Sequence, residues 1–231
     1  MPDFQQVIKN EQIVVFDGGM GALLQSRGMP AGVSPEEFGF SRPEIISEVH
    51  EAYLAAGAQV VTTNTFGGSR FKVPSGCDVT GLNRTLAALA RKAADNAAHE
   101  AWVAGSVGPT GHFLRPMGEL GFDELKQGFS EQITGLVQGG VDVILIETMF
   151  DLAEARAAVI AAREITDIPV GVSMTFETSM SLTGSSPEVF ALTMRNLGVD
   201  LLGSNCSAGP EGLLEVYERM ERHLSAPCLI E

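Results

Sequence analysis

Short apolar runs alternate with longer segments of helical periodicity along the chain. The runs are rich in β-branched residues and are followed by glycine or polar residues, which is typical of buried strands that end in turns. Seven runs are predicted to form strands, at residues 13–16, 59–63, 101–105, 141–146, 169–174, 200–203 and 226–230. Such nearly continuous apolar strands indicate a parallel sheet that is covered by helices on its faces.

The segments between these runs have the spacing of amphipathic helices. The helix that opens at Pro43, for example, carries apolar residues at helical intervals and ends at Gly57. The other predicted helices span residues 20–27, 82–99, 123–139, 151–165, 187–198 and 210–224, whereas 30–42 is expected to be a loop.

Strict alternation of strands and helices predicts an α/β fold. The polar and glycine-rich residues follow the strands, and the loops that lead into the strands are short, which favours a TIM-type (β/α)8 barrel with its site at the carboxyl ends of the strands. A doubly wound open sheet gives the same alternation and stays open as the alternative. No linker or shift in composition divides residues 1–231, so we expect a single domain.

The barrel is expected to be incomplete. Only seven strands of the eight can be assigned, and the last one runs to the end of the sequence. An open sheet has unpaired edges, and such edges favour self-association.

Composition excludes several classes of partner. A net charge of −14 argues against nucleic acids and anionic membranes, since both need clustered Lys and Arg. No segment has the pattern of a signal peptide or reaches the ~20 apolar residues of a membrane span. The three cysteines, Cys77, Cys206 and Cys228, are far apart and suggest no disulfide framework, so a cytoplasmic protein is expected.

Polar residues near the predicted strand ends are the candidates for chemistry: Asp17, Asn64, Thr65, His112, Glu147, Asp151, Glu177 and Cys206. A Schiff-base mechanism needs a lysine at this face, and the four lysines are predicted on helices or outer loops. A nucleophile paired with histidine needs a neighbouring His, and only His112 lies on the right face.

Two carboxylates and one thiol among these candidates suggest specific roles in ligand or metal binding. Asp17 and Glu147 each follow an apolar strand and, on one face, could hold a ligand ammonium; helix capping or a general acid–base pair fits equally well. Cys206 follows the run at 200–203 within the polar stretch from Gly203 to Gly209. It has no cysteine or histidine neighbour in sequence, so a metal ligand and an inert small side chain both stay open.

Seven segments in order carry a family resemblance: Asp17-Gly18-Gly19-Met20-Gly21-Ala22, Ser41-Arg42-Pro43-Glu44, Ala55-Ala56-Gly57-Ala58, Thr63-Asn64-Thr65-Phe66-Gly67, Gly108-Pro109-Thr110, Ile146-Glu147-Thr148-Met149-Phe150-Asp151 and Gly203-Ser204-Asn205-Cys206. Together they resemble the homocysteine S-methyltransferase family. Within it they resemble most closely the N-terminal homocysteine-binding modules of cobalamin-dependent methionine synthases. The resemblance covers almost the whole chain.

The resemblance implies a (β/α)8 barrel that binds homocysteine and zinc at its C-terminal face. Glu147, with Asp17 close by, would hold the amino group of homocysteine, and the backbone after Asp17 would face its carboxylate. The substrate-binding residues implied in this way are Asp17, Gly19, Met20, Asn64, Thr65 and Glu147.

The resemblance also implies the chemistry. Cys206 would be the first of three zinc-ligating cysteines, and zinc would keep the homocysteine sulfur as a thiolate at neutral pH. Methylcobalamin is the expected methyl donor, with cobalamin- and folate-binding modules elsewhere. The family's other two zinc cysteines are adjacent, in a Gly-Gly-Cys-Cys-Gly segment after the eighth strand, which this sequence does not reach. The alternative is a zinc-free amino-acid-binding or assembly module that has lost catalysis.

Overall fold

A single parallel sheet forms the centre of the computed structural model, which describes residues 4–10, 13–177, 179–206, 209–224 and 226–230. The six strands of the described sheet lie side by side in chain order and are β1 (Val60–Thr62), β2 (Trp102–Val107), β3 (Val143–Met149), β4 (Val170–Met174), β5 (Leu201–Ser204) and β6 (Cys228–Ile230). A doubly wound sheet would reverse its strand order, so that alternative is wrong.

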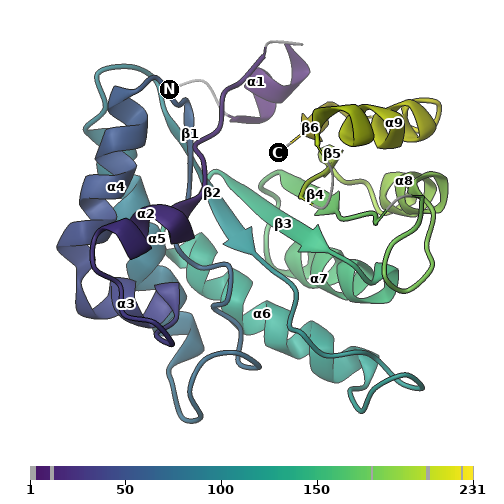
Figure 1. Cartoon of the computed structure of the whole chain (residues 1–231), viewed down its shortest axis with the longest axis horizontal. Coiled ribbons are helices and arrows are strands. Elements are labelled where there is room, and N and C mark those ends of the chain that lie inside the picture. Colours follow the sequence, from purple (N-terminus) through teal and green to yellow (C-terminus); the bar gives the residue numbers. More distant parts are fainter. Residues whose placement is uncertain (1–3, 11–12, 178, 207–208, 225, 231) are drawn as a thin grey trace.

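Helices cover the outer side of the curled sheet, which has the shape of a half-barrel (Figure 1). These outer helices are α4 (Pro43–Ala55), α5 (Val79–Asp95), α6 (Phe122–Gln138), α7 (Leu152–Ile165), α8 (Pro187–Asn196) and α9 (Pro210–Glu221). The shorter helices are α1 (Phe4–Lys9), α2 (Met20–Ser26) and α3 (Pro35–Ser41). Within the described residues, no helix is long and apolar enough to cross a membrane. The incomplete TIM-type barrel predicted from the sequence is confirmed.

Alternate strand residues face the two sides of the sheet and build two apolar clusters. Ile144 and Val172 belong to the outer cluster, between sheet and helices. Val143 and Leu145 belong to the inner cluster, on the concave side. Helix α1 also joins the inner cluster, where Phe4 packs on Trp102 with their ring centroids 5.8 Å apart. The amino-terminal end of the half-barrel is thereby filled with apolar side chains.

The first predicted strand, at residues 13–16, is not a buried strand. It touches β1 through one bridge, between Phe16 and Val60, and through hydrogen bonds such as that from the Gln59 N–H to the Val15 carbonyl at 2.8 Å. Ile13 is 92% exposed, because the segment lies at a sheet edge with a neighbour on one side only. The count of seven strands is therefore wrong by one.

The half-barrel has two open edges, one at residues 13–16 and the other at β6. Val15 and Ile230 are 52% and 55% exposed there. Self-association through these edges stays a prediction.

The predicted loop at residues 30–42 contains helix α3. Ser34 caps it by accepting a hydrogen bond from the Glu37 N–H at 3.2 Å, and Pro35 occupies the first turn. These two residues were a readable start signal for a helix. Helix α5 likewise starts earlier than predicted, because Asp78 caps it through the Gly81 N–H at 2.9 Å.

His50 on α4 is a fully buried polar side chain. Its ring is 0% exposed, and neither ring nitrogen has a hydrogen-bond partner among the described residues. Burial lowers the pKa of His50 to about 4. Below pH 6.5, the ordinary pKa of histidine, His50 therefore binds a proton in the unfolded chain but stays neutral in the folded chain until about pH 4.

Replacing His50 with leucine is expected to stabilise the fold by about 1–2 kcal/mol at pH 7, because two unsatisfied buried nitrogens disappear. The gain should grow as the pH falls from about 6.5 towards 4, since the unfolded wild-type chain then binds a proton that the folded chain excludes. Urea unfolding at pH 7 and pH 5 measures both effects.

His50→Gln is the matched control: it keeps buried polar atoms and should bring no gain at pH 7, but it should share the extra gain at pH 5, because glutamine binds no proton in the unfolded chain. A His50→Leu chain that is less stable than wild type at both pH values would contradict this account of His50.

Candidate functional site

A polar layer follows the inner apolar layer at the carboxyl ends of the strands. Each of its members lies two residues after an apolar residue or a glycine on the inner face of the same chain segment. This spacing is expected because side chains alternate between the two faces along a strand. These residues are Thr62 of β1, Ser106 of β2, Glu147 of β3, Ser173 of β4 and Asn205 after β5.

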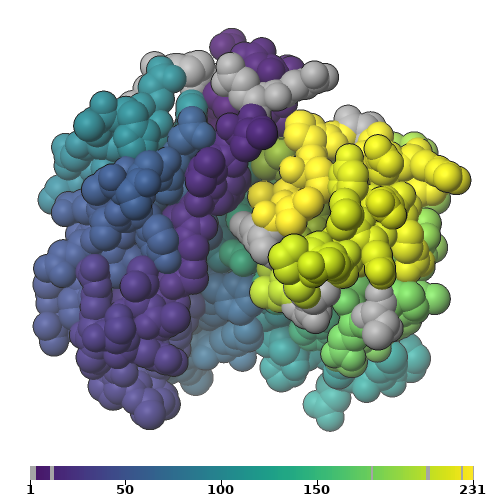
Figure 2. Space-filling view, turned by 45° about the horizontal axis from the view of Figure 1, so that its top comes forward, coloured from purple at the N-terminus to yellow at the C-terminus, as the bar shows by residue number. Residues whose placement is uncertain are grey.

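The polar layer opens into a cavity of about 1290 Å³. It lies between the two open edges of the half-barrel, and Figure 2 shows the hollow between the purple N-terminal segment and the yellow C-terminal elements. The structure brings to this one cavity all seven residues that the family resemblance assigned to the site, namely Asp17, Gly19, Met20, Asn64, Thr65, Glu147 and Cys206.

Asp17 is fixed by β1. One carboxylate oxygen accepts a hydrogen bond from the Thr62 N–H at 2.9 Å, and the other accepts one from the Thr62 hydroxyl at 2.7 Å. Burial raises the pKa of Asp17 to about 6, against the lowering effect of these bonds, and the nearby Glu147 adds to the rise. The capping alternative is wrong for Asp17, because Gly19 caps α2 and no side chain bonds there.

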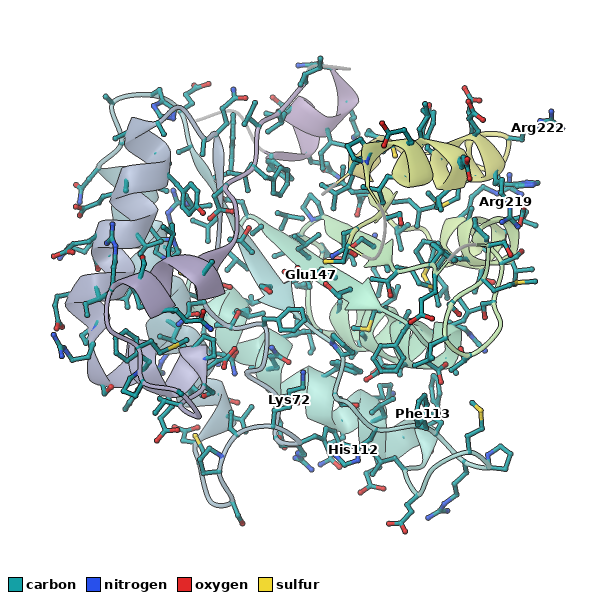
Figure 3. The ribbon with its side chains drawn as sticks, viewed as in Figure 1. Lys72, His112, Phe113, Glu147, Arg219 and Arg222 are labelled. Atoms are coloured by element: carbon teal, nitrogen blue, oxygen red, sulfur yellow. The ribbon has the colours of Figure 1, made fainter. Side chains whose placement is uncertain are left out.

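Glu147 lies near the middle of the concave side (Figure 3). Its Oε1 accepts a hydrogen bond from the Ser106 hydroxyl at 2.6 Å. Burial raises the pKa of Glu147, while hydrogen bonds from Ser106 and Thr148 lower it. Glu147 lies within strand β3, so it caps no helix.

The two carboxylates thus share one cavity, and the charge of Glu147 raises the cost of ionising Asp17. Among the described residues, no Lys or Arg forms an ion pair with Asp17 or Glu147. Such a pair attracts a cation, and a ligand ammonium can donate to both.

The loop after β1 is pinned by buried polar side chains. Asn64 donates from Nδ2 to the Pro35 carbonyl at 2.6 Å, which ties the loop to α3. Thr65 donates from its hydroxyl to the Ser106 carbonyl at 2.8 Å. Both residues are therefore held rigidly where they line the cavity.

Cys206 is exposed and lines the cavity next to Asn205, whose Nδ2 lies 3.6 Å from its sulfur. The described residues contain no group of three His, Cys, Asp or Glu side chains able to hold a metal ion. Alone, they do not fit a complete zinc site. Ser207 and Ala208, part of the polar stretch singled out in the sequence, lie outside the described residues.

The other two cysteines lie in different surroundings. Cys77 lies exposed in a loop, and Cys228 lies in β6, where burial raises its thiol pKa to about 11.

Three further candidates lie away from the cavity lining. Asp151 caps α7 by accepting from the Ala153 N–H at 2.7 Å. His112 packs on the ring of Phe71, with centroids 5.8 Å apart. Asp151, His112 and Glu177 are not among the residues that line the cavity.

Lys72 was missed. It lines the cavity instead of lying on an outer loop, and its ammonium lies 5.1 Å from the centroid of the Phe66 ring. Burial lowers the pKa of Lys72, whereas Glu36 and Glu154 raise it. Figure 3 shows it near His112 and apart from Glu147. Lys72 lies in the same loop as Asn64, between β1 and α5, and this shared loop could have indicated its place at the cavity.

Comparisons with known proteins agree on one family. The model of the family described as homocysteine S-methyltransferase matches residues 14–230. Methionine synthases of Mycobacterium leprae and Mycobacterium tuberculosis are each 32% identical to this chain, over 95% and 96% of its length. The chain spans about 20% of the length of these relatives.

The fold agrees with a solved relative. The metallated form of the homocysteine methyltransferase MmuM from Escherichia coli superposes with a TM-score of 0.85. That match covers 97% of this chain and 85% of MmuM at 23% identity, which speaks for the fold alone. With the family model matching nearly every residue, the chain belongs to the homocysteine S-methyltransferase family.

Proposed function

We propose that this chain binds homocysteine and presents its sulfur for methylation to methionine, with methylcobalamin as the methyl donor. The family membership and the relatives named methionine synthase support this proposal. The observation that carries it is the pair of carboxylates, Asp17 and Glu147, in one cavity without a basic partner among the described residues.

The amino-acid end of the substrate is assigned to the N-terminal half of the chain. Asp17 and Glu147 accept hydrogen bonds from the ammonium, and each carboxylate is already oriented by a neighbouring strand. The backbone around Gly19 and Met20 faces the substrate carboxylate. Asn64 and Thr65 form the wall beside it. Rigid anchoring at this end fixes the direction in which the side chain of homocysteine extends.

The sulfur end is assigned to the region of Cys206. There the homocysteine thiol releases its proton to solvent, a sulfur lone pair forms the new bond to the methyl carbon, and the donor keeps the electron pair of the bond that breaks. The family's zinc would hold the sulfur as a thiolate. Because the described residues supply one thiol and no three-group cluster, we propose that the other zinc ligands come from polypeptide beyond them.

The methyl donor is assigned to other modules. The relatives are far longer than the part that this chain matches, which leaves room for cobalamin- and folate-binding modules. In this proposal the open cavity receives the donor from the carboxyl-end side of the strands, where the sulfur is exposed.

Amino-acid binding is expected to weaken in acid. Methionine serves as the probe, since it carries the same ammonium and carboxylate. Because the pKa of Asp17 is about 6 in the empty site, protonation removes an acceptor, and the Kd should rise about tenfold from pH 7 to pH 5. Isothermal calorimetry at both pH values measures it.

Asp17→Asn should bind weakly at both pH values and lose most of this dependence. Asp78→Asn, at the cap of α5, is the matched control and should behave as wild type. Equal wild-type affinity at the two pH values would contradict the role of Asp17.

The two ends of the site are expected to separate by mutation. Glu147→Gln should weaken methionine binding by at least tenfold, because a charge-assisted hydrogen bond is lost. Cys206→Ala should leave methionine affinity within about twofold of wild type, since the sulfur end contributes little to anchoring. Calorimetry on both variants tests this division, and the reverse order of effects would contradict it.

Zinc binding tests the sulfur end. The chain joined to the adjacent-cysteine segment of a methionine synthase is expected to bind one zinc, and Cys206→Ala in that joined chain should lower the zinc affinity at least tenfold. Metal analysis after dialysis gives the stoichiometry. Methionine binding without zinc binding by the joined chain would instead support the zinc-free binding module.

A further inference from the structure

Two strained backbone positions lie at the site. Among the described residues other than glycine, only Thr148 and Cys206 have a positive φ, of 60° and 57°. A β-branched residue such as threonine is disfavoured there, because its side chain crowds the backbone. Such strain persists only when surrounding contacts enforce it, and it concentrates at functional sites. Thr148 directly follows Glu147, so both strained residues adjoin or form the proposed anchors.

A β-bulge in β3 creates the first of these positions. Ile146 pairs with Val172 and Met149 pairs with Met174, so two residues of β3, Glu147 and Thr148, stand opposite one residue of β4. Ile146 and Met149 both pack in the outer cluster although they are three residues apart. Glu147 and Thr148 therefore both lie on the inner side, as the extra residue of a bulge allows.

The carboxamide of Asn205 fills the space beside this bulge. Its Oδ1 accepts hydrogen bonds from the Thr148 N–H at 3.2 Å and from the Ser173 hydroxyl at 2.9 Å. Its Nδ2 donates to the Thr148 hydroxyl at 2.7 Å and lies 3.6 Å from the Cys206 sulfur. Asn205 is 2% exposed, so these contacts replace water and use both ends of the amide.

One side chain thus connects three neighbouring strand ends. It touches both strained residues, and it joins the end of β3, which carries Glu147, to the end of β5, which carries Cys206. Aspartate in its place would lack the N–H that donates to the Thr148 hydroxyl. An apolar residue would leave the Thr148 N–H without the closer of its two acceptors. Among the natural side chains, asparagine suits this combination of two acceptor and two donor contacts in so short a reach.

We propose that Asn205 is a positioning residue for the methyl-transfer site. It holds Thr148 and Cys206 in their left-handed conformations and thereby fixes the Glu147 carboxylate and the Cys206 sulfur relative to each other. The inference rests on the proposed function, because it assigns the two ends of the substrate to these two residues. Without Asn205, the ends of β3 and β5 relax independently, and neither anchor keeps its direction.

The test uses the 231-residue chain and three readouts. Calorimetry gives the methionine affinity. Alkylation by iodoacetamide, followed by peptide mass spectrometry, gives the rate at Cys206 relative to the exposed Cys77. Urea unfolding gives the stability. Asn205→Ala removes all the carboxamide contacts, and Asn205→Asp keeps the size and removes the donor, which covers the case in which the alanine variant does not fold.

Each Asn205 variant is expected to weaken methionine binding about five- to tenfold and to change the Cys206 to Cys77 alkylation ratio at least threefold, while still unfolding cooperatively. The matched pair Thr148→Ser and Thr148→Val distinguishes the effect of the Thr148 hydroxyl from the effect of its β-branched shape. Serine keeps the acceptor for Nδ2 and should resemble wild type, whereas valine should change the alkylation ratio in the same direction as Asn205→Ala.

Lower stability with unchanged methionine affinity and an unchanged alkylation ratio in both Asn205 variants would overturn the positioning role. That outcome differs from failure of the proposed function, in which the wild-type chain itself binds neither methionine nor homocysteine.

Discussion

The central feature of the structure is a pair of buried carboxylates, Asp17 and Glu147, that have no ion-pair partner among the described residues. Asp17 and Glu147 are drawn partly out of solvent into one cavity, where burial raises the pKa of both. Hydrogen bonds from Thr62 and Ser106 orient them without neutralising them. The apolar inner layer and the outer helices hold the strand ends in place, and in the proposed complex a ligand ammonium would offset the cost of burying the two carboxylates.

The same alternation of side chains that builds the core also builds the site. Inner apolar residues such as Leu145 give way, two positions later, to inner polar residues such as Glu147. The bulge in β3 then adds Thr148 to the inner side, where it meets Asn205. Glu147 and Cys206, the two residues proposed to hold the ends of the substrate, are therefore parts of one connected polar layer and do not lie on separate loops.

Much of this was readable from the sequence. Apolar runs located all six strands of the described sheet with small boundary errors, and strand-end polarity placed Asp17, Glu147 and Cys206 at one face. The edge segment at 13–16 was misjudged because composition does not reveal whether a strand has neighbours on both sides. Asn205 was not singled out as a site residue, because its role depends on contacts with Thr148 and Ser173, which lie far from it in the sequence. Lys72 was placed on an outer loop, although it shares the loop that carries Asn64.

The most direct test of the account is the proton balance of binding. When an ammonium ligand binds at pH 6, an Asp17 that is half protonated must ionise, so about half a proton or more should be released per methionine bound. Calorimetry in buffers of different ionisation enthalpy measures this number. Release at pH 6 that shrinks towards zero near pH 7.5 is the predicted result, and binding at pH 6 without proton release would contradict the central role of the paired carboxylates.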